Sequence, residues 1–378
     1  MSDFYLKHDQ RYLWFDLIRG LAAMMVCFSH LRVVVLEDYG QITSPSSIDK
    51  LIYYITGLGH QSVMMFFVLS GFFVGGSVLR NIDKFNWFNY MVARISRLWV
   101  VLIPALLLTY LVGLTLAGYA PSVLSGQFNE IWHSGPNSGE YSTSFVTLIG
   151  NVFFLQTIIS PVFGVNGPLW SLANEFWYYL LFPMVINAMG GFTDYSNKLL
   201  KMLSLALAIT IFMIMPVAMR YGFLIWVFGV CLYWALQRWV KLGALYTSLT
   251  AILFFGLLFY SKLHVGQSID IVLGASFATF CLGLAHCEAP KTCIRCFTKI
   301  SRGLSEISYS LYLSHFPLVL LIGVFYYPSA RMVPSFASYT QLIAWFLLLV
   351  LVGSAFWWLF ERHTNQFRVE VMKALKLK

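Results

Sequence analysis

Ten long apolar stretches divide this chain, and they constrain its fold more than any other feature of the sequence. Each is close to the length, about 20 residues, that an α-helix needs to cross a bilayer. Only 11% of the 378 residues are charged, whereas soluble domains have about a quarter, so polar surface is too scarce to cover a soluble globule. We therefore predict an all-α polytopic membrane protein with spans at about 13–35, 59–79, 91–118, 168–189, 199–218, 221–237, 243–260, 267–286, 304–326 and 338–360.

An eleventh apolar candidate lies at about 146–164. Asn151 and Gln156 interrupt it, and it ends in Ser160-Pro161. Unsatisfied polar groups are costly in lipid, and proline stops a helix. The pattern therefore predicts one re-entrant or interfacial segment here and no eleventh span.

Basic residues support this topology. An eleventh span would move the later basic loops to the side of the membrane that disfavours positive charge. We therefore predict that both termini are cytoplasmic, with a transmembrane domain over 1–362 and a basic tail, 363–378, against anionic lipid. The net charge of +9 follows the topology and forms no single basic face, so it does not indicate nucleic-acid binding. With ten spans, only five of the 25 Lys and Arg fall outside the cell, namely Arg32, Lys50, Arg220, Lys262 and Arg331.

The first span contains Asp16, Arg19 and His30. Ionisable groups inside a span are costly and usually functional. Arg19 and His30 are about three helical turns apart, so they share a face and lie about 16 Å apart along the axis; Asp16 can pair with Arg19. A long ligand such as acyl-coenzyme A fits this spacing, with Arg19 on phosphate and His30 as a base. Alternatively, Arg19 reaches the interface and His30 hydrogen-bonds another helix.

Two more titratable groups lie in later spans. Glu175 is about two turns into a helix that Pro168 opens, and it can orient His30 or make a structural hydrogen bond. His315 lies in the middle of the ninth span, where Pro317 frees the carbonyl of residue 313. For His315 the alternatives are a second catalytic group and a packing histidine, and a supporting role is favoured.

Two weaker signals suggest no further chemistry. Cys293 and Cys296 form a C-x-x-C near His286 and Cys287, but this is not a standard zinc spacing, and we predict reduced thiols and no metal. Ser70 precedes a glycine in an apolar helix and lacks the context of a nucleophile elbow, so it indicates close helix packing.

Four ordered motifs in this chain resemble those of the membrane-bound acyltransferase 3 family. Each is weak alone, but their joint order is specific and covers most of the chain. They are the run Phe15–Ala23 continuing to His30, the run Phe66–Phe72, Leu169–Glu175 with its Trp-Ser-Leu-x-x-Glu pattern, and Ser308–Pro317. The sequence departs from the family in its closing Glu-x-Pro pattern, which reads Glu361-Arg362-His363.

The resemblance implies an enzyme of the bacterial inner membrane that moves an acyl group, commonly acetyl, from cytoplasmic acyl-CoA to a hydroxyl of an envelope polysaccharide or lipid-linked sugar. Arg19 and His30 would be its essential pair, with His30 as general base or acyl carrier and Glu175 holding the imidazole. Arg94 and Arg97 match a basic motif that could bind coenzyme phosphates, and they equally fit plain positive-inside anchoring. Supporting residues would be Asp16, Ser70 and His315.

Two other functions fit the same residues. A proton-coupled transporter of a small polar solute would relay protons through the titratable residues of the spans, although no internal repeat is visible. A polymer flippase accessory would not need the imidazole of His30.

Overall fold

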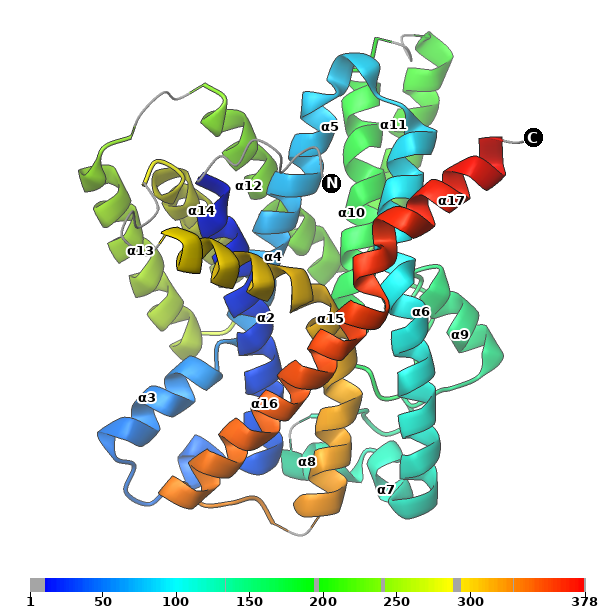
Figure 1. The fold of residues 1–378 in the computed structure, drawn as a ribbon. Coiled ribbons are helices and arrows are strands. Elements are labelled where there is room, and N and C mark those ends of the chain that lie inside the picture. Colours follow the sequence, from blue (N-terminus) through cyan, green and yellow to red (C-terminus); the bar gives the residue numbers. More distant parts are fainter. Residues whose placement is uncertain are drawn as a thin grey trace. The chain divides into compact units, whose positions relative to one another are not determined.

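The computed structural model describes residues 11–132, 134–193, 197–238, 242–287, 294–328 and 330–376, and this part of the chain is helical with no strand (Figure 1). All ten predicted stretches lie on helices, so the all-α prediction is confirmed. The longer helices are α2 (Arg11–Val35), α4 (Gly59–Ser70), α6 (Trp87–Tyr119), α10 (Leu169–Ala188), α11 (Lys198–Ile214), α12 (Val217–Leu236), α13 (Ala244–Leu263), α14 (Gln267–Leu284), α15 (Ile294–Tyr326), α16 (Phe336–Leu359) and α17 (Thr364–Lys376). The shorter ones are η1 (Tyr39–Gln41), α3 (Ser47–Thr56), η2 (Gly71–Gly75), α5 (Gly76–Arg80), η3 (Ile82–Lys84), α7 (Pro121–Leu124), α8 (Gln127–Trp132), α9 (Phe145–Val152) and η5 (Glu361–His363).

Eight helical segments in the described part of the chain are long and apolar enough to cross a membrane. The stretches predicted at 168–189 and 199–218 form α10 and α11, but these two helices are not among the eight. α11 has only 17 residues, fewer than the roughly 20 of a typical span. The protein is therefore an all-helical membrane protein, while the count of ten spans and the cytoplasmic position of both ends stay predictions.

The segment at 146–164 contains only α9, a helix of 8 residues. At 1.5 Å per residue α9 is about 12 Å long, well short of the roughly 30 Å hydrocarbon core. Asn151 Nδ2 donates to the carbonyl of Pro161 at 3.0 Å, and Gln156 Nε2 donates to the carbonyl of Leu169 at 2.9 Å. The polar residues that interrupt the apolar pattern thus bind the backbone of a compact turn, as expected of a segment that does not span.

Helix ends differ from the apolar stretches where local chemistry overrides hydropathy. α11 ends at Ile214 because Met215 is extended before Pro216, which disfavours helix for the residue before it. α15 begins at Ile294, well before the predicted start at 304, because basic residues and serine do not stop a helix. The predicted basic tail forms α17 in the structure.

The chain forms two compact units, and several helices contribute residues to each. Unit 1 consists of Met1–Arg19, Val63–Ile95 and Asn174–Leu304, and unit 2 of Gly20–Ser62, Ser96–Ala173 and Ser305–Lys378.

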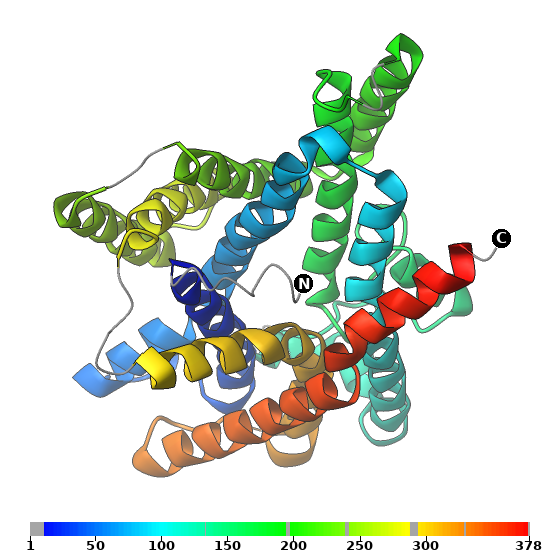
Figure 2. The same ribbon diagram turned by 45° about the horizontal axis from the view of Figure 1, so that its top comes forward.

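Unit 1 contains a close helix contact made by glycines. A Cβ atom on Gly71 would lie 1.8 Å from the carbonyl oxygen of Trp226, and one on Gly229 would lie 1.8 Å from that of Val68. Small residues let helix backbones approach in this way, so the close helix packing predicted at Gly71 is observed. Elsewhere in unit 1, α13 and α14 lie side by side in both views (Figures 1 and 2).

Unit 2 is held together by an apolar cluster from α2, α15 and α16 with the segments that pack on them. Leu31, Trp132 and Leu311 are fully buried in this cluster. Gly353 of α16 allows a close approach, because a Cβ there would lie 2.9 Å from the Cα of Leu311. The middle of α15 is therefore fixed against its neighbours in unit 2.

Two of the basic residues predicted outside, Arg331 and Arg220, donate hydrogen bonds to oxygen acceptors. Arg331 donates to the two carboxylate oxygens of Asp38 at 3.0 and 2.7 Å, with only 6% of its side chain exposed. Arg220 donates to the carbonyls of Met213 and Met215 at 2.7 and 2.9 Å, at the end of α11. Bidentate pairing compensates the charge of Arg331, and binding to helix-end carbonyls compensates that of Arg220.

Candidate active site

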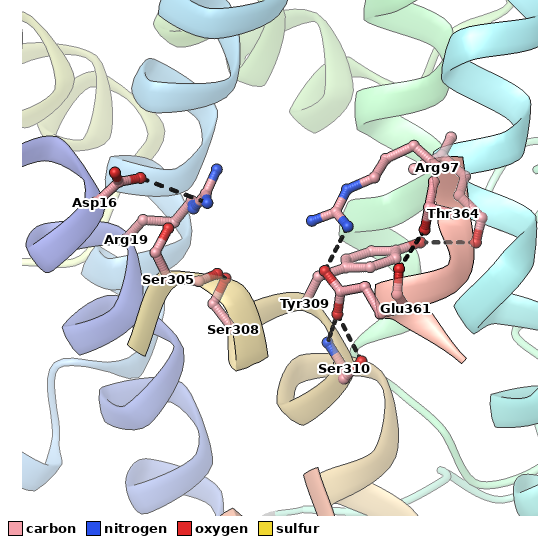
Figure 3. Close-up of polar contacts among 10 residues, drawn as sticks. Asp16, Arg19, Arg97, Ser305, Ser308, Tyr309, Ser310, Glu361 and Thr364 are labelled. Atoms are coloured by element: carbon pink, nitrogen blue, oxygen red, sulfur yellow. Dashed lines mark hydrogen bonds and ion pairs between the residues drawn. The ribbon is translucent and has the colours of Figure 1, made fainter. Parts of the chain in front are cut away.

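Helix α2 contains the first three predicted site residues. It is unbroken, so the eleven residues from Arg19 to His30 are helical, as the spacing argument requires. In unit 1, Nη2 of Arg19 lies 3.6 Å from Oδ1 of Asp16 (Figure 3). The Arg19 guanidinium also lies 5.6 Å from the ring centre of Phe73. The structure therefore contains the Asp16–Arg19 pair that the sequence predicted.

In unit 2, His30 pairs with His315, which is 285 positions away in the sequence. Nδ1 of His30 lies 2.9 Å from Nε2 of His315, and the two ring planes are 15° apart. His315 is fully buried, whereas His30 is partly exposed. Nδ1 of His315 lies 3.0 Å from the carbonyl oxygen of Leu311 and 2.8 Å from that of Tyr312. The two imidazoles thus form a hydrogen-bonded chain that ends on the helix backbone.

The carbonyl that Pro317 frees has a partner. Nδ2 of Asn166 donates to the carbonyl of Leu313 at 3.0 Å and to Oγ1 of Thr109 at 3.2 Å. Asn166 is fully buried, so this amide satisfies the backbone where water cannot. The helix carbonyl that Pro317 leaves without a backbone donor therefore accepts a hydrogen bond from a side chain in another segment.

Two aromatic residues frame the histidine pair. The ring of Phe316 meets His30 edge to face, with ring centres 4.9 Å apart. The hydroxyl of Tyr312 lies 2.7 Å from that of Ser171, which belongs to the Trp-Ser-Leu motif at the start of α10. The contact between Ser171 and Tyr312 links that motif to the motif around His315.

Glu175 lies in unit 1, in a series of hydrogen bonds that includes Tyr179 and Ser70. Tyr179 donates to Oε2 of Glu175 at 3.0 Å, the hydroxyl of Ser70 lies 3.1 Å from that of Tyr179, and Trp226 donates to Ser70 at 3.1 Å. Two predicted residues, Ser70 and Glu175, are therefore linked through Tyr179. The expected role of Glu175 in holding the imidazole of His30 stays a prediction.

The two predicted phosphate-binding arginines have different surroundings. In unit 1, Arg94 lies over the ring of Tyr90 at 5.6 Å, and its Nε is buried with no hydrogen-bond acceptor among the described residues. In unit 2, Arg97 forms an ion pair with Glu361 and lies 5.2 Å from the ring centre of Tyr309 (Figure 3). Arg97 is therefore already engaged by a carboxylate, so less of its hydrogen-bonding capacity is left for a phosphate.

Glu361 has more contacts than the sequence suggested. It is buried, and its Oε2 accepts from the backbone N–H of Ser310 at 3.1 Å and from the Ser310 hydroxyl at 2.6 Å (Figure 3). The carboxylate thus caps a backbone donor within α15 and neutralises Arg97. Although the closing motif lacks its proline, its glutamate holds the helix that carries His315.

Replacing Glu361 with alanine is expected to destabilise the protein by about 3 kcal/mol, because it leaves a charge and a buried N–H without their partner. The matched control is Glu370→Ala, which breaks an exposed pair with Lys373 worth about 0 to 1 kcal/mol. Thermal melting of both variants in detergent measures the difference. Equal melting temperatures would show that Glu361 does not stabilise α15.

The structure describes only part of the Cys-x-x-C pattern, because Cys293 lies outside the described residues. Cys287 is partly exposed and Cys296 exposed, and both are free thiols. The described residues contain no group of three or more His, Cys, Asp or Glu that could hold a metal ion.

Sequence reasoning did not identify Tyr179, Asn166 or Glu361 as site residues. Tyr179 follows Glu175 by four residues on a helix, so a signal for their contact was present in the spacing. Glu361 was visible only as part of an incomplete motif, and nothing local indicates the partner of Asn166. The pairing of His30 with His315 was likewise not predicted.

Comparison with known proteins identifies the family. The family model of an acyltransferase domain matches residues 12–362. The chain is 27% identical to an O-acetyl transferase of Shigella phage Sf6 over 201 residues, 51% of this chain and 51% of that protein. It is 26% identical to the acyltransferase MdmB of Streptomyces mycarofaciens over 171 residues, 44% of this chain and 37% of that protein.

These alignments cover about half or less of the length of the curated relatives. No solved structure matches the chain. The family match nevertheless runs from the first helix to the buried glutamate after the last long one, and it includes all four motifs. The chain therefore belongs to the acyltransferase 3 family, and it contains several helices long and apolar enough to cross a membrane.

Proposed function

We propose that this protein transfers an acetyl group from cytoplasmic acetyl-CoA to a hydroxyl of an envelope polysaccharide or lipid-linked sugar in the inner membrane of a bacterium. The observation that carries the proposal is the His30 imidazole, which is partly exposed on a membrane helix and hydrogen-bonded to a second, buried imidazole. An imidazole oriented by a hydrogen bond is the commonest general base for activating a hydroxyl. The similarity to a protein named O-acetyl transferase supports acetyl as the group and oxygen as its acceptor.

The proposed reaction needs one base and a site for the donor. His30 removes the proton of the acceptor hydroxyl, whose oxygen attacks the thioester carbonyl; the C–S bond breaks, and coenzyme A leaves as a thiol with that proton. Alternatively, the imidazole first attacks the thioester and carries the acetyl group to the hydroxyl. Incubation with radiolabelled acetyl-CoA and no acceptor distinguishes these routes, since only the second labels the protein on His30.

The donor's phosphate groups are assigned to arginines. Arg19 has a planar guanidinium with five N–H donors, and its Nη2 lies 3.6 Å from Oδ1 of Asp16. Arg94 has no acidic partner among the described residues. Arg97 is engaged by Glu361, so we expect a smaller contribution from it. Charge-assisted hydrogen bonds from guanidinium to phosphate supply both affinity and orientation.

Substitution of Arg19 by glutamine is expected to raise the KM for acetyl-CoA by about tenfold or more, because a charged hydrogen bond contributes about 1.5–3 kcal/mol. Arg238→Gln is the matched control, since Arg238 stacks on Trp234 at the end of α12 and has no proposed contact with the donor. Initial rates of thiol release at varied acetyl-CoA, with protein in lipid nanodiscs, give both values. An unchanged KM in the Arg19 variant would remove Arg19 from the donor site.

The function itself is tested with the wild-type protein in proteoliposomes. Acetyl-CoA is supplied on one side and an envelope glycan extract on the other, and mass spectrometry follows acetylation of the glycan. The proposal predicts acetylated glycan that depends on acetyl-CoA. Solute uptake driven by a pH gradient and indifferent to acetyl-CoA would instead establish the transporter function.

A further inference from the structure

The hydrogen-bonded chain through His30 and His315 has a direction that its acceptors determine. This series of hydrogen bonds ends on the carbonyl oxygens of Leu311 and Tyr312, which lie 3.0 and 2.8 Å from Nδ1 of His315. A carbonyl oxygen can only accept a hydrogen bond, so Nδ1 of His315 carries a proton. In a neutral His315 the other ring nitrogen, Nε2, is then unprotonated, and this is the atom that lies 2.9 Å from Nδ1 of His30.

The tautomer of His30 follows from that of His315. The unprotonated Nε2 of His315 accepts the hydrogen bond, so Nδ1 of His30 is the donor and carries the proton of its neutral ring. The lone pair of His30 is then on Nε2, which has no hydrogen-bond partner in the part of the chain that the structure describes. The opposite direction needs a fully buried His315 cation, and no acidic side chain contacts His315 among the described residues. Burial of an unpaired charge is costly.

We propose that His315 is a positioning residue that makes Nε2 of His30 the reactive nitrogen and, by accepting the hydrogen bond from Nδ1–H of His30, stabilises the ring of His30 when acyl transfer charges it. This inference rests on the proposed acyltransferase function. Nε2 of His30 accepts the hydroxyl proton as the new C–O bond forms and the C–S bond breaks. The positive charge that arises on His30 is shared with His315 through the Nδ1–H···Nε2 hydrogen bond. The two carbonyl oxygens at Nδ1 of His315 stabilise that charge, and the proton taken from the hydroxyl then leaves with the thiol.

The surroundings of His315 suit a residue that must keep one orientation. Its ring is fully buried, and it packs against Tyr312 and Phe316 with ring centres 5.9 and 6.2 Å apart. Asn166 donates a hydrogen bond to the carbonyl of Leu313, only two residues before His315. Because both ring nitrogens are hydrogen-bonded, the tautomer and the orientation of this imidazole are fixed.

Two substitutions that differ by one methylene group test the inference. Glutamine at 315 can place its amide oxygen near the position of the imidazole Nε2 and can accept from His30. Asparagine reaches only the position of Nδ1 and cannot contact His30. We expect His315→Asn to lower kcat for acetyl transfer by about a hundredfold with an unchanged KM for acetyl-CoA, and His315→Gln to stay within about tenfold of wild type. Ser314→Ala, which removes a buried hydroxyl that donates to the carbonyl of Ser310, is expected to keep wild-type kcat.

The possible outcomes separate this inference from the proposed function. Steady-state kinetics are measured on protein that elutes as a single folded species, with melting temperatures for each variant. Wild-type kcat in His315→Asn, or equal losses in the asparagine and glutamine variants at equal folded yield, would overturn the role of His315 while leaving acyl transfer in place. If the wild-type protein transfers no acetyl group, the proposed function itself fails.

Discussion

Replacing His30 with glutamine is expected to lower kcat for acetyl transfer by about 10²- to 10⁴-fold, the usual contribution of a general base. Glutamine is polar and similar in length to histidine, so the fold should persist, although its amide lies near the position of Nε2 and not near that of Nδ1. It cannot accept a proton at the position of Nε2 or carry an acyl group. Thiol release and glycan acetylation in nanodiscs measure the loss.

The matched control for His30 is His264→Gln. His264 is exposed at the end of α13, where its ring contacts Tyr260, and its replacement should leave kcat unchanged. Full activity of the His30 variant would contradict the enzyme mechanism and favour a non-catalytic role such as a flippase accessory. Loss of proton-driven uptake without loss of thiol release would favour a transporter.

Replacing Gly71 with alanine is expected to destabilise unit 1 by about 3 kcal/mol or more, which is at the upper end for overpacking. The new Cβ would lie 1.8 Å from the carbonyl oxygen of Trp226, less than any allowed contact. Backbone atoms cannot move aside as a flexible side chain can, so η2, which contains Gly71, and α12 would have to separate. They would then lose the hydrogen bond from Trp226 to Ser70. Folded yield and melting temperature in detergent report the effect.

Gly256→Ala provides the comparison for this substitution. Gly256 lies inside α13, and a Cβ added there would have no atom within 4 Å, so alanine should be neutral or slightly stabilising, as expected for a helix. Similar melting temperatures for the two variants would show that the glycine contact is not tight. Activity of the Gly71 variant should fall only in proportion to the folded fraction.

The sequence contained much of the helical pattern and the identity of the main polar groups. Hydropathy is a local property, and lipid forces each apolar run to satisfy its backbone internally, so ten stretches could be assigned to helices without coordinates. The same reasoning identified His30, Glu175 and His315 as groups that lipid would not tolerate without a reason. It also identified residues 146–164 as a segment too polar to span.

Other features depend on contacts that no local pattern contains. His30 meets His315 across 285 positions, Ser310 meets Glu361 across 51, and Asn166 meets Leu313 across 147. Which buried donor meets which acceptor depends on how the helices rotate and pack, and many arrangements of the same helices satisfy hydropathy equally well. The sequence by itself therefore determined the helices, the membrane class and the family. Only the tertiary structure decided that His315 bonds Nδ1 of His30 and that Glu361 engages Arg97, because hydrogen bonds need atoms placed within a few tenths of an ångström.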